Sequence, residues 1–102
     1  MPTLLFVRGL GANREWMERL GDLSVDGVGF DFPTAPAARD FEVSFRLPGE
    51  GAPRSLLATV TEARPRGRMY FVGARIEGVD DDARRAIARA LDARRIQGPA
   101  RD

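Results

Sequence analysis

Apolar and polar residues alternate along most of the chain up to about residue 79, which predicts a protein built mainly from β-strands. The clearest run covers residues 41–47, where Phe41, Val43, Phe45 and Leu47 are separated by polar residues. Similar alternation predicts further strands at residues 4–10, 15–23, 28–32, 55–63 and 68–79. Gly- and Pro-containing segments separate these runs, including a hairpin-type connection at 11–13 and a strand end at 65–67. This pattern is typical of a small antiparallel barrel or sandwich.

The second strand has a helical alternative. Residues 14–20 contain good helix formers, and Glu15 and Arg19 have the i,i+4 spacing of a helical ion pair. We favour a strand because every second side chain from Trp16 to Leu20 falls on one face of an extended chain, and a glycine closes the run before a helix gains length.

The end of the chain changes to helical periodicity. Small and apolar residues recur between Ala83 and Leu91 at the spacing of one helix face, which predicts a C-terminal helix over residues 83–95. Asp80 is a suitable N-cap, and we prefer this role to a Mg²⁺ or Ca²⁺ site because three consecutive aspartates lack EF-hand spacing. Gly98 and Pro99 then end the helix, so we expect one domain over residues 1–97 and a flexible tail at 98–102.

Composition narrows the chemistry. The chain has 102 residues, enough for one core, and its 16 basic residues are all arginine against 15 acidic residues. A net charge of +1 predicts no global attraction to nucleic acid or membranes. The absence of cysteine, histidine and lysine removes thiol nucleophiles, the usual neutral-pH base and Schiff-base chemistry. The apolar start is too short to span a bilayer. We therefore expect a cytoplasmic protein that is not an enzyme and carries no cofactor or metal.

Residues 21–30 are the most distinctive stretch. Asp22, Ser24 and Gly27 lie between two apolar runs, where a strand must turn and re-enter a sheet. In a structural interpretation the two polar side chains cap loop amides, and Gly27 supplies a positive φ. In a functional interpretation the same residues bind a ligand. The pattern alone leaves both open.

The motif from Asp22 to Gly27 resembles the [D/N]xSxxG signature of the PilZ domain family. The similarity extends over residues 3–95, through the order of strands, a Gly73–Ile76 strand end and the terminal helix. This resemblance implies a mainly β fold, a six-stranded antiparallel Greek-key barrel with a C-terminal α-helix. It also implies a receptor for cyclic di-GMP, with a half-site at Asp22, Ser24 and Gly27 and with Arg8 as the nearest arginine.

The second family signature, an RxxxR motif ahead of the first barrel strand, is absent from this sequence. Arg8 is followed at the required spacing by Ala12, and Arg14 and Arg19 are one residue too far apart. Two phosphates call for guanidinium groups, which bind them in a bidentate manner. Each missing charge-assisted hydrogen bond is worth about 1.5–3 kcal/mol, so we expect nucleotide binding to be weak or lost.

The resemblance implies a signalling or adaptor domain in cyclic di-GMP-linked control of motility, attachment or polysaccharide production, with a protein partner. The alternative is a ligand-independent PilZ domain that docks a pilus, flagellar or kinase partner through Trp16, or through Arg85 and Arg89 on the helix. A weaker alternative is a nucleic-acid-binding barrel. It would use Arg64, Arg66 and Arg68, for which a solvated hairpin tip is the simpler interpretation. We expect no membrane insertion.

Overall fold

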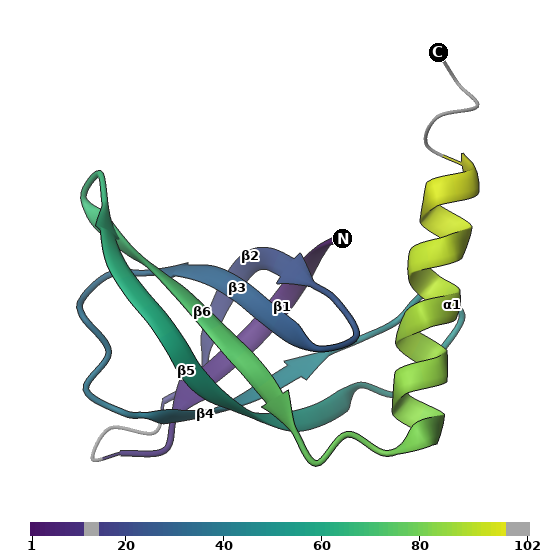
Figure 1. The fold of residues 1–102 in the computed structure, drawn as a ribbon, viewed down its shortest axis with the longest axis horizontal. Helices are drawn as coiled ribbons and strands as arrows, with labels where there is room; N and C mark the ends of the chain where they lie inside the picture. The colour runs from purple at the N-terminus through teal and green to yellow at the C-terminus, as the bar shows by residue number, and fades with distance from the viewer. Residues whose placement is uncertain (12–14, 98–102) are drawn as a thin grey trace.

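The computed structural model describes residues 1–11 and 15–97, with side chains through residue 93, as six strands followed by one helix (Figure 1). The elements are β1 (Pro2–Gly9), β2 (Met17–Leu23), β3 (Gly27–Phe32), β4 (Asp40–Phe45), β5 (Arg54–Arg66), β6 (Met69–Glu77) and α1 (Asp81–Gln97). All predicted strands and the helix are present. The segment predicted at 15–23 is a strand from Met17 onward and not a helix. The predicted connection at 11–13 lies largely, and the tail at 98–102 wholly, outside the described residues.

The strands close into a barrel in the order β1-β2-β3-β6-β5-β4, with antiparallel neighbours throughout. The non-consecutive pairs β1–β4 and β3–β6 close it. This confirms the expected six-stranded Greek-key barrel with a C-terminal helix. Closure pairs every strand over most of its length, so the barrel leaves few unpaired edges.

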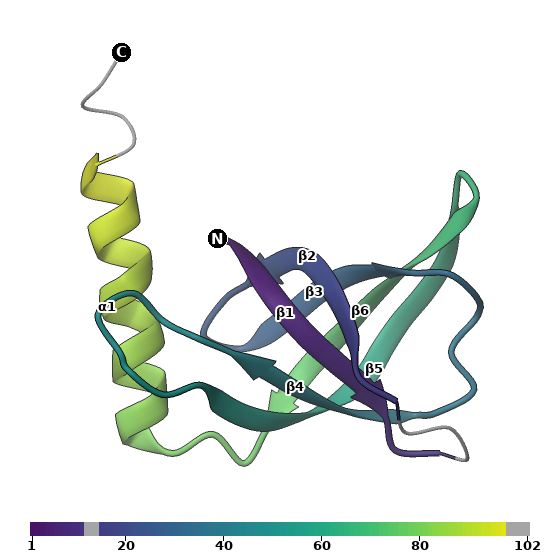
Figure 2. The same cartoon turned by 180° about the vertical axis from the view of Figure 1, so that it is seen from behind.

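The core follows directly from the alternation in the sequence. Phe30, Phe41 and Phe45 point into the barrel and are almost completely buried, and the rings of Phe30 and Phe41 meet edge to face with centroids 5.6 Å apart. The helix closes one end of the barrel (Figures 1 and 2), where Ile87 joins the same buried cluster as Leu47. Helix and barrel therefore share one core.

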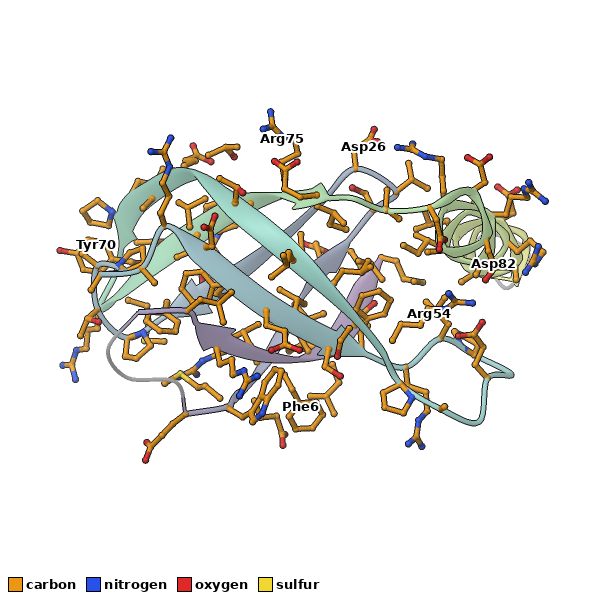
Figure 3. The ribbon with its side chains drawn as sticks, turned by 90° about the horizontal axis from the view of Figure 1, so that it is seen from below. Phe6, Asp26, Arg54, Tyr70, Arg75 and Asp82 are labelled. Atoms are coloured by element: carbon orange, nitrogen blue, oxygen red, sulfur yellow. The ribbon has the colours of Figure 1, made fainter. Side chains whose placement is uncertain are left out.

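Polar contacts at the start of α1 cap the helix and attach it to the barrel. The backbone N–H of Ala83 donates to Oδ1 of Asp80 at 2.8 Å, which confirms the predicted N-cap. Arg54 donates to Glu50 at 2.9 Å and to Asp82 in the first helical turn at 3.2 Å (Figure 3). The hydrogen bond from Arg54 holds the pKa of the Glu50 carboxyl below its usual value.

One strand boundary differs from the prediction. We expected β5 to stop before residue 65, but it continues to Arg66, and Pro65 pairs with Tyr70 of β6. Pairing with β4 ends at Thr59, so the outer part of β5 has a neighbour on one side only. A proline is tolerated on such an edge because its missing N–H is not needed by a second neighbour. The result is the β5–β6 hairpin that projects beyond the barrel in Figure 1.

Within the part of the chain that the structure describes, no helix combines the length and apolarity needed to cross a membrane.

Candidate functional site

The Asp22–Gly27 motif forms the turn between β2 and β3. The backbone N–H of Ser24 donates to the carbonyl oxygen of Gly27 at 2.9 Å, and the N–H of Gly27 donates back to Oγ of Ser24 at 3.1 Å. The Ser24 hydroxyl lies 3.2 Å from the same Gly27 carbonyl, to which it can donate. Ser24 therefore closes the turn, as the structural interpretation of the motif expects.

Gly27 is required for a different reason from the predicted one. Its φ is not positive: the positive-φ glycines of the described residues are Gly49, Gly67 and Gly78. A Cβ at Gly27 would instead lie 2.9 Å from the carbonyl oxygen of Ala74 on β6. The expectation of a left-handed backbone was wrong, because the constraint is the close approach of a neighbouring strand.

The turn is fixed to two other elements. The N–H of Ile76 in β6 donates to the carbonyl oxygen of Asp26 at 3.0 Å, and Arg84 of α1 lies 3.0 Å from the Asp26 carboxylate. Asp26 and Arg84 are both exposed, so this ion pair contributes little to stability. These contacts nevertheless hold the turn in one position relative to β6 and the helix.

Asp22 differs from Ser24 and Gly27 because its side chain takes no part in closing the turn. The carboxylate is 80% exposed, and the charged neighbour that the structure shows for it is the amino group of Met1 at 3.8 Å. An exposed carboxylate on a fixed backbone can accept hydrogen bonds from the N–H groups of a ligand. Asp22 is thus the residue of the motif whose side chain is available for binding.

A shallow depression of about 390 Å³ adjoins this turn on the outer surface of β3 and β6. Its floor contains Gly29 and Gly73, which pair across the two strands, with the ring of Phe71 leaning over Gly29. Carboxylates stand at both sides, from Asp22 on β2 and Glu62 on β5. A Cβ at Gly29 or Gly73 would lie 3.0 Å or 3.5 Å from the Phe71 ring, so the two glycines make room for this ring, which covers the floor.

Two arginines of the β5–β6 hairpin lie near this depression. The guanidinium carbons of Arg64 and Arg66 are each 4.9 Å from the centre of the Phe71 ring, in cation–π geometry. Both are paired with carboxylates, Arg64 with Glu62 at 3.2 Å and Arg66 with Asp31 at 2.6 Å. These arginines are half-exposed, but a phosphate would have to displace their present partners.

The sequence analysis did not identify Phe71 or the two glycines of the depression as site residues. Gly29, Phe71 and Gly73 become neighbours only through the register of β3 and β6. A glycine on the outward face of a strand is a weak signal of close approach. Without the register, nothing in the sequence connects the two glycines.

Arg8 does not join the other three predicted half-site residues. Asp22 pairs with Pro2 at the start of β1, whereas Arg8 is six residues further along that strand, a separation of roughly 20 Å. Its guanidinium binds Glu42 through Nε at 2.8 Å and Nη2 at 2.6 Å, and lies 4.6 Å from the centre of the Trp16 ring. The structure therefore places Arg8 in a separate cluster on the outer surface of β1 and β4.

The predicted partner-surface residues lie on two separate surfaces. Trp16 is 44% exposed and lies beside Arg8, whereas Arg85 and Arg89 are exposed on α1, beyond the opposite end of β1. A single small partner would not contact both through one flat surface. Trp16 belongs with the exposed side chains of β1 and β2.

Comparison with known proteins agrees with the barrel fold. The chain resembles a solved structure, the inhibitor of motility MotI/DgrA of Bacillus subtilis, with a TM-score of 0.72 and 13% sequence identity. The alignment covers 96% of this chain and 49% of that one, so the chain spans about half the length of that protein. No curated protein sequence matches. The PilZ domain family matches residues 1–93, so the chain belongs to the PilZ domain family.

Proposed function

We propose that this PilZ domain acts as a receptor or adaptor in cyclic di-GMP-linked regulation, and that the 102-residue chain binds the nucleotide weakly. The observation that carries the proposal is the division of roles in the motif. Ser24 and Gly27 hold the turn rigidly, while the exposed carboxylate of Asp22 remains available beside a depression floored by glycines.

The chemistry of the depression suits a guanine base. The Watson–Crick edge of guanine carries N–H donors, including its exocyclic amine, and these match the acceptor oxygens of Asp22. The Phe71 ring lies over Gly29 and Gly73 and is an aromatic surface on which a base can stack in place of the guanidinium groups of Arg64 and Arg66. The same depression is poor for phosphate because Asp22 and Glu62 are both anionic.

Recognition of the two phosphates limits the affinity of this domain for cyclic di-GMP. No RxxxR motif precedes the turn in this sequence, and Arg64 and Arg66 are already paired with carboxylates. Two absent arginine contacts remove about 3–6 kcal/mol, which is about two to four orders of magnitude in the dissociation constant. The domain therefore works through contacts with a protein partner rather than through tight nucleotide binding alone.

The process that this domain regulates is also part of the proposal. The similar structure is titled an inhibitor of motility, and motility control by a cytoplasmic domain of this kind is our leading assignment, ahead of attachment and polysaccharide production. The composition argues against an enzyme because the chain has no histidine, cysteine or lysine.

A ligand-independent docking domain is the second candidate. It is favoured by the exposure of large apolar side chains on β1 and β2, among them Leu20, which is 73% exposed. A nucleic-acid role is less well supported. Of the three hairpin arginines that it would use, Arg64 and Arg66 each have a carboxylate partner, which leaves the exposed Arg68 as the one cation of the three without an ion pair among the described residues.

The proposal is tested by mapping amide chemical shifts during titration with cyclic di-GMP. We expect chemical-shift changes in the fast-exchange regime, and we expect them to be concentrated at residues 22–29 and 71–74. Asp22→Ala removes them by deleting the acceptor, whereas Asp26→Ala retains them, because Asp26 is an exposed aspartate of the same turn that faces Arg84. Shifts that gather elsewhere, or that survive Asp22→Ala, would show that this turn is not the nucleotide site.

A further inference from the structure

The two sides of the barrel differ in the chemistry of their outward side chains. In the part of the chain that the structure describes, the large apolar side chains with substantial exposure are Leu4, Phe6, Trp16, Leu20 and Leu57. They come from β1, from β2 and the residue before it, and from β5. Phe6 projects from the side of the barrel opposite to Arg75 and Asp26, as Figure 3 shows. The side of β3 and β6 carries ion pairs instead, such as Arg75 with Glu77 and Arg66 with Asp31.

Strand register brings the apolar side chains together. Leu4 of β1 pairs directly with Leu20 of β2, and Phe6 pairs with Glu18 on one side and with Ser44 of β4 on the other. We call the surface formed by Leu4, Phe6 and Leu20 the β1 face. A depression of about 440 Å³ adjoins it, lined by Leu4, Phe6, Ser44, Phe45, Arg46 and Pro53. An apolar surface of this kind marks an interaction site more often than a solvated wall.

The charges around the β1 face fall into two classes. Arg8 and Glu42 satisfy each other at one end of the face, and Arg8 also covers Trp16. Glu18 and Arg46 lie on opposite sides of β1, and neither has a charged partner among the residues that the structure describes. The face therefore carries an apolar centre with one unpaired anion on the β2 side and one unpaired cation on the β4 side.

We propose that the β1 face binds a second copy of this chain in a two-fold symmetric dimer. A two-fold axis along β1 sets Leu4 and Phe6 against their own counterparts and lays β2 of one copy over β4 of the other. Glu18 is level with Ser44 across β1, so Glu18 of each copy then lies two residues along the strand from Arg46 of the other, within reach of the long arginine side chain. A two-fold interface requires such self-complementarity, and one acid and one base placed either side of an apolar centre supply it.

The size of the face sets the strength of the dimer. Three strands at about 4.8 Å spacing and the length from Trp16 to Leu20 define an area of roughly 15 Å by 15 Å. Two such faces bury roughly 450 Å² in total, which is below the roughly 1,000 Å² of a stable specific interface, so the dimer is weak and transient. We therefore expect a dimer with a dissociation constant in the range of roughly 0.1–1 mM, which forms at high local concentration.

Sedimentation equilibrium of the 102-residue chain tests the proposal. The expected result is a mass that rises with concentration from that of the 11.2 kDa monomer towards twice that value. Glu18→Arg and Arg46→Glu each place like charges across the interface and weaken the dimer by about tenfold or more. The double variant, with both substitutions, restores the attraction and returns the dissociation constant to within about threefold of the original. Arg68→Glu is the matched control on the hairpin, away from the face, and leaves the dimer unchanged.

A second variant separates loss of contact from loss of fold. Leu20→Ser removes an apolar side chain that is 73% exposed, so the circular dichroism spectrum and unfolding midpoint stay unchanged while the dimer is lost. A chain that remains monomeric up to about 1 mM overturns the proposal and leaves the β1 face to a different protein. A dimer that forms but ignores both charge reversals and Leu20→Ser also overturns it, because the copies then meet through another surface.

Discussion

At the scale of single residues, close backbone approach explains the glycines of the candidate site better than turn conformation does. Gly21 shows this most clearly: a Cβ there would lie 2.3 Å from the carbonyl oxygen of Gly29 and 2.7 Å from Cδ1 of Leu5. β2 can pair with β3 at this distance only if residue 21 has no side chain. Packing between adjacent strands therefore sets the identity of this position.

Gly21→Ala is expected to destabilise the domain by about 3 kcal/mol or more, because backbone and core atoms on both sides must move. Gly51→Ala is the matched control, since a Cβ at Gly51 meets nothing within 4 Å and should change stability by no more than about 0.5 kcal/mol. Urea unfolding followed by the fluorescence of Trp16 measures both. Equal midpoints for the two variants would contradict the close packing of β2 against β3.

The candidate site shows what could be predicted at this scale and what could not. The spacing of Asp22, Ser24 and Gly27 indicated the turn correctly, because the hydrogen bonds that close it join residues three apart. The reason why residue 27 is glycine was predicted wrongly, because Ala74, whose carbonyl oxygen it approaches, is far away in the sequence. Arg8 was grouped with the turn for a similar reason: sequence separation did not reveal that it lies at the other end of β1.

At the scale of elements, the helix was predictable because its determinants are local. The apolar spacing and the Asp80 cap are both visible within a few residues, and both are present in the structure. The outer part of β5 was not predictable in the same way. Whether a proline interrupts a strand depends on whether that strand has one neighbour or two, and Pro65 lies where β5 has only one.

Asp80→Ala is expected to lower the free energy of unfolding by about 1 kcal/mol, because the N–H of Ala83 loses its acceptor at the helix N-terminus. Asp80→Asn keeps a side-chain oxygen in the same place and should retain most of that stability. Thermal unfolding of the two variants provides the comparison. If Asp80→Asn is as destabilised as Asp80→Ala, charge rather than capping is the main contribution of Asp80.

At the scale of the whole molecule, barrel closure creates two outer surfaces with different chemistry, the β1 face and the outer surface of β3 and β6. Alternation in the sequence showed which side chains point outward. It did not show which outward side chains of different strands are neighbours. The β1 face and the glycine-floored depression both depend on pairs such as Leu4 with Leu20 and Gly29 with Gly73, which only register reveals. We therefore assign nucleotide contact to the outer surface of β3 and β6, with Asp22 of β2 at its edge, and protein contact to the β1 face.

Isothermal titration calorimetry of the 102-residue chain with cyclic di-GMP tests the central claim most directly. The claim is that the Asp22–Gly27 turn is an intact half-site without the arginines that would hold the phosphates. We predict a dissociation constant of about 10 µM or weaker, and further weakening by Asp22→Ala. A sub-micromolar dissociation constant for the unmodified chain would contradict the account, because it would require phosphate contacts that neither the sequence nor the described structure provides.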